Sequence, residues 1–320
     1  MRWQGVRSRS SVVEIPRSSG KTNPMFAFLI IGPTATGKSS LAVEFSERAG
    51  GEIVSADAFQ VYSGLDILSA KPAPELRARV PHHLIGEVPL AARFDAGQWR
   101  KRAAQCIADI AARGRVPVVC GGSGLYIRAL THGLAEMPAA DANLRAALEK
   151  EPLPALAARL RSLDPGSTVD MKNPRRVVRA LEVCILTGRP FSSFRTGWEG
   201  DSPFGGVILT RAREELHARI AARTLAMFES GVVEEVAVAG EIGPTAGQML
   251  GLREIRELLA GRMTRAECVE AIQGATRNYA RRQLTWFRKE RGCQWIDLTE
   301  ASDPAGEVER AWSAASRSLR

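Results

Sequence analysis

The fold is decided by residues 26–39, whose sequence is FAFLIIGPTATGKS. The apolar run over 26–31 predicts a buried strand, and residues 32–39 match the pattern G-x-x-x-x-G-K-[ST] in full. Apolar residues then recur at helical spacing as far as Ala49, so a strand precedes the motif and a helix follows it. In that context successive backbone N–H groups and a helix N-terminus form an anion-binding nest. The stretch therefore predicts a loop that binds a di- or triphosphate, without specifying phosphoryl transfer.

The side chains of this phosphate loop have separate predicted roles. Lys38 neutralises terminal phosphate oxygens, and the hydroxyl of Ser39 holds Mg²⁺. The whole predicted diphosphate-binding set is Gly32, Pro33, Thr34, Ala35, Thr36, Gly37, Lys38 and Ser39.

Strand and helix patterns alternate outward from the loop. Short strands are expected at 53–54, 116–120, 205–210 and 295–298, and helical patterns cover 96–113, 211–238 and 264–291. This alternation predicts a parallel α/β sheet. From 139 to 204 strand signals vanish and prolines separate short helical patterns, so we expect a core of 25–138 and 205–320 with an inserted helical domain. The basic segment 1–24 is expected to be a disordered extension.

The composition and net charge of the chain indicate which kinds of partner it can bind. The 320 residues include 44 Lys and Arg against 35 Asp and Glu, a net charge of +9, which favours polyanionic partners. The five cysteines form no C-x-x-C pair, which argues against a zinc site or a disulfide framework and fits a reducing cytoplasm. No apolar run approaches the roughly 18 residues of a membrane span, so no membrane partner is expected.

Polar residues follow two of the predicted strands. Asp57 ends the second strand, at the sheet edge where ligands bind, and can act as a general base or bind metal through water. The alternative is a capping or surface carboxylate. Gln60 can read an adenine edge. After the strand at 116–120 no acid appears, and Ser123 stands where a Walker B carboxylate is expected, either to bind substrate or as part of a tight turn.

Arginines gather in two further places. Arg175, Arg176 and Arg179 lie at helical spacing, and Arg277, Arg281 and Arg288 share one helix face with aromatics nearby. Either cluster alone is typical of a solvated face, but two in a basic chain favour nucleic acid. Arg213, just after the strand at 205–210, is placed to reach the diphosphate or to be a surface residue at a helix start.

Taken together, these residues resemble the bacterial tRNA dimethylallyltransferases. The matching strings are GPTATGKS at 32–39, GGEIVSADAFQVYSGLDI at 50–67, AKPAPELRARVPHHLI at 70–85, GRVPVVCGGSGLYIRAL at 114–130, NPRRVVRALEVCILTGRP at 173–190 and TRNYARRQLTWFR at 276–288. The resemblance extends from about residue 26 to about residue 297. It implies a P-loop NTPase-like core in which the loop binds an isoprenoid diphosphate rather than ATP for hydrolysis.

The resemblance also implies a reaction and its residues. A dimethylallyl group passes from dimethylallyl diphosphate to the exocyclic N6 amine of the adenine 3′ of a tRNA anticodon, in a cytoplasmic monomer that uses Mg²⁺. Asp57 is then the general base, Arg213 binds diphosphate and Ser123 touches substrate. The implied contacts to the tRNA anticodon stem-loop are Asp57, Ala58, Phe59, Gln60, Ser123, Arg145, Arg175, Arg176, Arg179, Gln248, Arg253, Arg277, Arg281, Arg282 and Gln283.

Two departures from the family pattern stand out. Ala58 and Phe59 replace Ser-Met, and Gln248 and Leu252 replace an Arg and a Tyr. Alternatives from other classes also remain: a P-loop small-molecule kinase, a prenyltransferase on free adenine nucleotide, and a non-catalytic RNA-binding protein. The kinase predicts ATP turnover, and the nucleotide prenyltransferase predicts no tRNA affinity.

Overall fold

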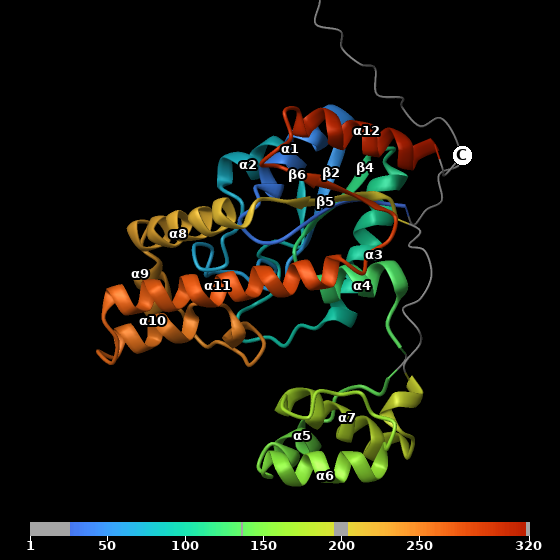
Figure 1. Ribbon diagram of the computed structural model, residues 1–320, viewed down its shortest axis with the longest axis vertical. Coiled ribbons are helices and arrows are strands. Elements are labelled where there is room, and N and C mark those ends of the chain that lie inside the picture. The colour runs from blue at the N-terminus through green and yellow to red at the C-terminus, as the bar shows by residue number, and fades with distance from the viewer. Residues whose placement is uncertain (1–25, 136, 195–203, 318–320) are drawn as a thin grey trace, which may run out of the picture. The chain divides into compact units, whose positions relative to one another are not determined.

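A computed structural model describes residues 26–135, 137–194 and 204–317, so the basic segment 1–24 lies outside the described residues. The described strands form one six-stranded parallel sheet with the order β3-β2-β4-β1-β5-β6 (Figure 1). Their bounds are β1 Phe28–Ile31, β2 Gly51–Ala56, β3 His82–His83, β4 Val116–Gly121, β5 Gly206–Thr210 and β6 Cys293–Asp297. The predicted parallel α/β sheet is confirmed.

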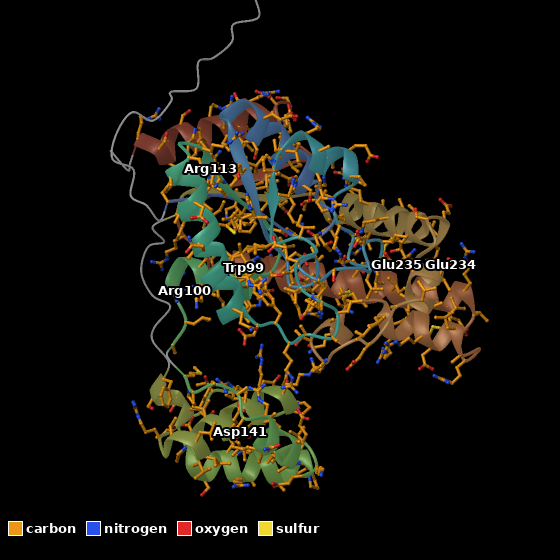
Figure 2. All side chains as sticks on the ribbon, turned by 180° about the vertical axis from the view of Figure 1, so that it is seen from behind. Trp99, Arg100, Arg113, Asp141, Glu234 and Glu235 are labelled. Carbon is orange, nitrogen blue, oxygen red and sulfur yellow. The ribbon has the colours of Figure 1, made fainter. Side chains whose placement is uncertain are left out.

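Helices cover both faces of the sheet, which is why its central strands are buried throughout (Figure 1). On one face α1 (Lys38–Ala49) and α12 (Pro304–Arg317) pack an aromatic cluster, in which the ring centroids of Phe28 and Trp312 lie 5.4 Å apart. On the other, Trp99 of α3 (Ala96–Ala112) stacks on Tyr126 of α4 (Gly124–His132) and donates to the Ser55 carbonyl at 2.9 Å (Figure 2).

A second group of helices follows β5 in the chain. α8 (Arg213–Glu229) ends two residues before Gly231. Gly231 has a left-handed φ of 90°, which interrupts the helix, and α9 (Val232–Ala237) begins directly after it. The single helical pattern expected at 211–238 is therefore two helices. α10 (Leu252–Leu259) and the 23-residue α11 (Arg265–Phe287) complete the group, and α11 contacts both α8 and α10 (Figure 1).

The chain divides into two compact units, residues 1–131 with 201–320 and residues 132–200. In the second unit α5 (Ala142–Leu148), α6 (Leu153–Leu163) and α7 (Pro174–Thr187) enclose a small apolar core that includes Leu160 and Leu181. The remaining short elements of the chain are α2 (Pro74–Arg79) and the 3₁₀ turns Phe191–Phe194 and Ala246–Gln248. None of the helices in the described residues is long and apolar enough to cross a membrane.

Candidate active site

The phosphate loop joins β1 to α1 and is folded tightly on itself. Gly37 has a φ of 96°, a left-handed conformation that glycine adopts without a steric penalty. The Thr36 hydroxyl donates to the Pro33 carbonyl at 3.0 Å, and the Lys38 ammonium donates to the same carbonyl at 3.3 Å. Burial lowers the pKa of Lys38 below its usual value, because desolvation disfavours the charged form. Lys38 is thus a buried amine inside the loop, hydrogen-bonded to the Pro33 carbonyl.

Three arginines surround this loop from the β5–α8 region. Arg211 donates to the Thr36 carbonyl at 2.8 Å, and Arg219 donates to the Ala35 carbonyl at the same distance. Arg223 donates to the Thr34 hydroxyl at 2.9 Å, and its Nε is buried without a hydrogen-bond partner among the described residues. These guanidinium groups add positive charge where the loop would bind an anion.

Arg213, which the sequence placed at the diphosphate, has a different position. Arg213 is the first residue of α8 and is exposed. The exposed Arg219 and the half-buried Arg223 lie four residues apart on the face of α8 that meets the loop. Since an α-helix turns about 100° per residue, Arg213 is rotated about 80° to 120° away from that face. The geometry thus favours Arg219 and Arg223 over Arg213 as diphosphate ligands.

Asp57 begins a turn directly after β2. Its Oδ1 accepts the backbone N–H groups of Phe59 at 2.9 Å and of Gln60 at 3.3 Å. Ser123, only 8% exposed, accepts the N–H of Ala58 at 2.9 Å through its hydroxyl oxygen. The serine after β4 thereby orders the turn that carries Asp57, which is a supporting role rather than a contact with the cavity.

The side chain of Gln60 is fixed at both ends. Its amide nitrogen donates to the Ala70 carbonyl at 2.9 Å, and its amide oxygen accepts from the Ser55 hydroxyl at 3.3 Å. Gln60 still faces the cavity described next.

One cavity of about 250 Å³ brings these groups together. Thr34, Lys38 and Ser39 line it from the phosphate loop and α1, and Asp57 and Gln60 line it from the turn after β2. Its other walls come from the 68–70 segment, α8, the segment before α10 and α11: Leu68, Ser69, Ala70, Arg219, Arg223, Met227, Met249, Leu250, Ile272, Thr276 and Tyr279. The predicted general base therefore shares one chamber with five of the eight predicted phosphate-binding residues: Thr34, Ala35, Gly37, Lys38 and Ser39.

The same cavity offers oxygen ligands for a cation. Ser39 and Asp57 both line it and also line a smaller adjoining pocket of about 20 Å³. A hydroxyl, a carboxylate and substrate phosphates are the oxygen donors that Mg²⁺ prefers, and Mg²⁺ usually keeps several waters. In the parts of the chain that the structure describes, no group of three or more His, Cys, Asp or Glu side chains could hold a metal ion. The residues present thus fit Mg²⁺ held together with a diphosphate.

Residues on α11 divide between the cavity and the surface. Thr276 and Tyr279 line the cavity, whereas Arg281 and Arg282 are exposed and Arg277 is half-buried. Gln283, expected to touch tRNA, is only 3% exposed and hydrogen-bonds Thr34 and Gly122 instead. This position is therefore wrong for a surface contact with RNA, because the side chain points into the protein.

The helical unit holds its arginines in two ways. Arg145 makes a bidentate pair with the buried Glu182 at 2.8 and 2.9 Å, and Arg179 pairs with the same carboxylate and with the Pro138 carbonyl. Arg175 and Arg176 are exposed at the start of α7. Glu182 thus fixes the side chains of Arg145 and Arg179, whereas Arg175 and Arg176 face solvent.

The remaining residues expected at the tRNA lie on or near the cavity side of the core. Ala58 and Phe59 are half-buried in the turn with Asp57, and Phe59 lines the cavity. Gln248 is exposed and donates to the Pro244 carbonyl at 2.9 Å, and the side chain of Arg253 is 85% exposed at the start of α10.

Sequence reasoning missed Arg219 and Arg223, and it identified Tyr279 only as an aromatic among the arginines of the 276–288 stretch, not as part of the cavity wall. A signal for the two arginines exists, since an Arg-x-x-x-Arg spacing in a helix right after a strand places two cations on one face. Nothing local distinguishes them from surface arginines, however, because their phosphate-loop partners lie more than 180 positions earlier in the chain.

Comparison with known proteins agrees with this geometry. The family model described as IPP transferase matches residues 60–290, more than half of the chain. A tRNA dimethylallyltransferase from Akkermansia muciniphila is 42% identical over 283 residues, 88% of this chain and 96% of that protein. One from Anaeromyxobacter dehalogenans is 45% identical over 279 residues, covering 84% and 93% of the two chains.

A solved structure is also similar. The tRNA isopentenylpyrophosphate transferase from Bacillus halodurans is 31% identical, with a TM-score of 0.68 over 92% of this chain and 97% of that one. The chain therefore belongs to the IPP transferase family.

Proposed function

We propose that this protein transfers a dimethylallyl group from dimethylallyl diphosphate to the exocyclic N6 amine of the adenine 3′ of a tRNA anticodon. The observation that carries the proposal is the shared cavity, in which Lys38 and Arg223 stand beside Asp57 and Gln60. A diphosphate donor and a base to be alkylated can therefore occupy one chamber. Family membership supports the same reaction.

Diphosphate leaves readily once its developing charge is neutralised. Lys38, Arg219 and Arg223 supply three cations around the loop. The buried Nε of Arg223, which has no hydrogen-bond partner in the described part of the chain, provides a donor for a phosphate oxygen. Mg²⁺, held by Ser39 and through water by Asp57, would neutralise further charge on the diphosphate.

The donor's hydrocarbon tail needs an apolar wall. Leu68, Met227, Met249, Leu250 and Ile272 line the cavity from four separate segments. Methionine side chains adapt to irregular apolar shapes, so this wall suits a short branched prenyl chain. The wall also shields an electron-deficient allylic carbon from water.

The acceptor amine needs a base and a fixed orientation. The amine is a poor nucleophile, and Asp57 accepts its proton as the C–N bond forms. Oδ1 of Asp57 is engaged by two backbone N–H groups, so the turn orients Oδ2 for the substrate. Gln60, fixed by Ser55 and Ala70, presents its amide to the adenine edge. The adenine must leave the anticodon-loop stack to reach this point.

Basic side chains outside the cavity would bind the tRNA backbone. Arg277, Arg281 and Arg282 are accessible or partly so on α11, and Arg175 and Arg176 are exposed on α7 of the helical unit. Phosphate contacts of this kind give affinity that does not depend on sequence. We assign both surfaces to the anticodon stem-loop, and Gln248 and Arg253 to its margin.

The test is label transfer from dimethylallyl diphosphate in the presence of Mg²⁺. Unmodified tRNA should become labelled, and free AMP should not be labelled at a comparable rate. ATP should not be hydrolysed. Labelling of AMP alone would favour the nucleotide prenyltransferase, and ATP turnover without prenyl transfer would favour a small-molecule kinase.

A further inference from the structure

A buried amide on α11 connects two separate segments of the active site. Gln283 Oε1 accepts the backbone N–H of Thr34 at 2.9 Å, and Gln283 Nε2 donates to the carbonyl of Gly122 at 2.8 Å. Those partners lie 249 and 161 positions earlier in the chain. One side chain thereby ties the phosphate loop to the turn after β4.

An amide suits this place better than another side chain of its size. Thr34 presents a donor and Gly122 presents an acceptor, and a neutral amide satisfies both at once. A carboxylate could only accept, and an apolar side chain could do neither. Gly122 is shaped for the contact, since a Cβ there would lie 2.2 Å from the Gln283 amide nitrogen.

The same helix also supports the turn that carries the proposed base. Tyr279, one helical turn before Gln283, interacts through its hydroxyl with Ser123 and with Gln283. Ser123 in turn accepts the Ala58 N–H at 2.9 Å, next to Asp57. The glycine-rich turn after β4 is pressed against α11 here, because a Cβ on Gly124 would lie 2.7 Å from Trp286.

The burial of Gln283 separates this role from RNA binding. Gln283 is 3% exposed, whereas the neighbouring Arg281 and Arg282 are exposed, rotated about 160° and 100° from it around the helix. An RNA backbone that reaches the arginines does not reach the amide. What the amide does reach is the backbone N–H group of Thr34, within the phosphate loop.

We propose that Gln283 is a positioning residue that holds the phosphate loop in its diphosphate-binding geometry. The inference rests on the proposed function, in which that loop binds dimethylallyl diphosphate. An anion nest works only while its N–H groups converge, and a loop with two glycines loses that arrangement when its anchor is removed. Removing Gln283 therefore weakens diphosphate binding without removing any group that touches the diphosphate.

The test compares Gln283→Met with Cys268→Ala. Methionine keeps the side-chain volume and removes both hydrogen bonds. Cys268 is fully buried in the same helix, about 22 Å along its axis from Gln283, so its variant controls for loss of stability alone. Gln283→Met should weaken dimethylallyl diphosphate binding and raise its KM about tenfold, because the loop loses its hydrogen bond from Thr34 to Gln283. The affinity for tRNA at fixed salt should stay within twofold.

Three quantities are measured on each protein: the affinity for dimethylallyl diphosphate by calorimetric titration, the affinity for tRNA, and the Tm by thermal denaturation. Unchanged diphosphate affinity, or a loss equal to that of Cys268→Ala at equal Tm, overturns the role of Gln283. A selective loss of tRNA affinity overturns it in favour of an RNA contact. If Gln283→Met does not fold, Gln283→Glu carries the test, and its added negative charge should weaken diphosphate binding further. Wild-type protein that binds no diphosphate contradicts the proposed function itself.

Discussion

The carboxylate of Glu235 holds the backbone of Leu68, since its Oε2 accepts the Leu68 N–H at 2.9 Å. Its Oε1 accepts the N–H of the preceding Ile67 at the same distance. The segment needs such an anchor, because Leu65 and Ala70 on either side have φ values of 50° and 51°, which L side chains rarely adopt. Leu68 lines the cavity, so an acid on α9 shapes its wall.

Glu235→Ala should therefore destabilise the protein and slow prenyl transfer. Two backbone N–H groups lose a charged acceptor, which should lower the free energy of unfolding by about 2 kcal/mol. kcat/KM should fall about tenfold, because the Ala70 carbonyl that fixes Gln60 lies in the released segment. Glu234→Ala is the matched control, since its side chain is exposed beside Glu235 on the same helix (Figure 2). Equal Tm and kcat/KM in the two variants would contradict the anchor.

Asp57→Asn should lower kcat by about 100-fold, the usual scale for loss of a general base. The amide retains an oxygen that can accept the N–H groups of Phe59 and Gln60, so the turn should persist. Calorimetry should find dimethylallyl diphosphate affinity little changed. Single-turnover label transfer with saturating tRNA measures the rate of the chemical step. A near-normal rate in Asp57→Asn would show that Asp57 is not the general base.

Lys38 gives diphosphate binding a pH dependence. Burial lowers its pKa in the free protein below the ordinary 10.5, and a bound diphosphate raises that pKa again by favouring the ammonium. Binding then takes up a proton at alkaline pH, so affinity should fall as pH rises through the lowered pKa of Lys38.

Pyrophosphate titrations at several alkaline pH values check this expectation. Lys38→Arg is the control, because a guanidinium stays charged across that range and should flatten the curve. Lys38→Ala should bind weakly at every pH. A wild-type affinity that stays constant across the alkaline titrations would show that Lys38 is not the titrating group.

Much of the core could be predicted because its signals are local. The apolar run before Gly32 and the loop motif define β1, the loop and α1 together, and Asp57 follows from its place at a strand end. The two-residue β3 at His82–His83 was missed, since it is too short to show an alternating pattern. Its position at the sheet edge comes from pairing with β2 rather than from its own sequence.

The parts of the site that the sequence did not predict depend on helix rotation and on distant partners. Arg213 is nearer to β5 in sequence than Arg223, yet the rotation of α8 directs the later arginine to the loop. Gln283 lies in a basic, aromatic stretch that is typical of RNA binding, and only the tertiary structure shows that it faces inward. The composition of this stretch indicates a basic, aromatic helix, but it does not show which side of that helix is buried.

Arg223→Gln and Arg213→Gln should therefore differ sharply. The first removes a cation at the phosphate loop and should weaken dimethylallyl diphosphate binding at least tenfold. The second removes an exposed cation from the start of the same helix and should change that affinity less than twofold. Calorimetric titration of both variants, matched in charge, measures the difference. Equal losses of diphosphate affinity in the two variants would indicate that Arg213 also binds the diphosphate.

Arg277 and Arg281 lie four residues apart on α11, in a position to contact successive RNA phosphates. Replacing both with Ala should weaken tRNA binding and reduce the slope of log affinity against log salt by about two, or roughly one per lost phosphate contact. Dimethylallyl diphosphate binding should be unchanged, because neither side chain lines the cavity.

The matched control for this pair is Arg79→Ala with Arg310→Ala. It removes the same charge from α2 and α12, where both side chains are exposed and pair with Glu47 and Asp303. If net charge alone attracts tRNA, the two double variants should lose equal affinity and equal slope. A loss confined to the α11 variant locates the RNA backbone on that helix. Wild-type affinity and slope in the α11 variant would instead make these arginines an ordinary solvated face.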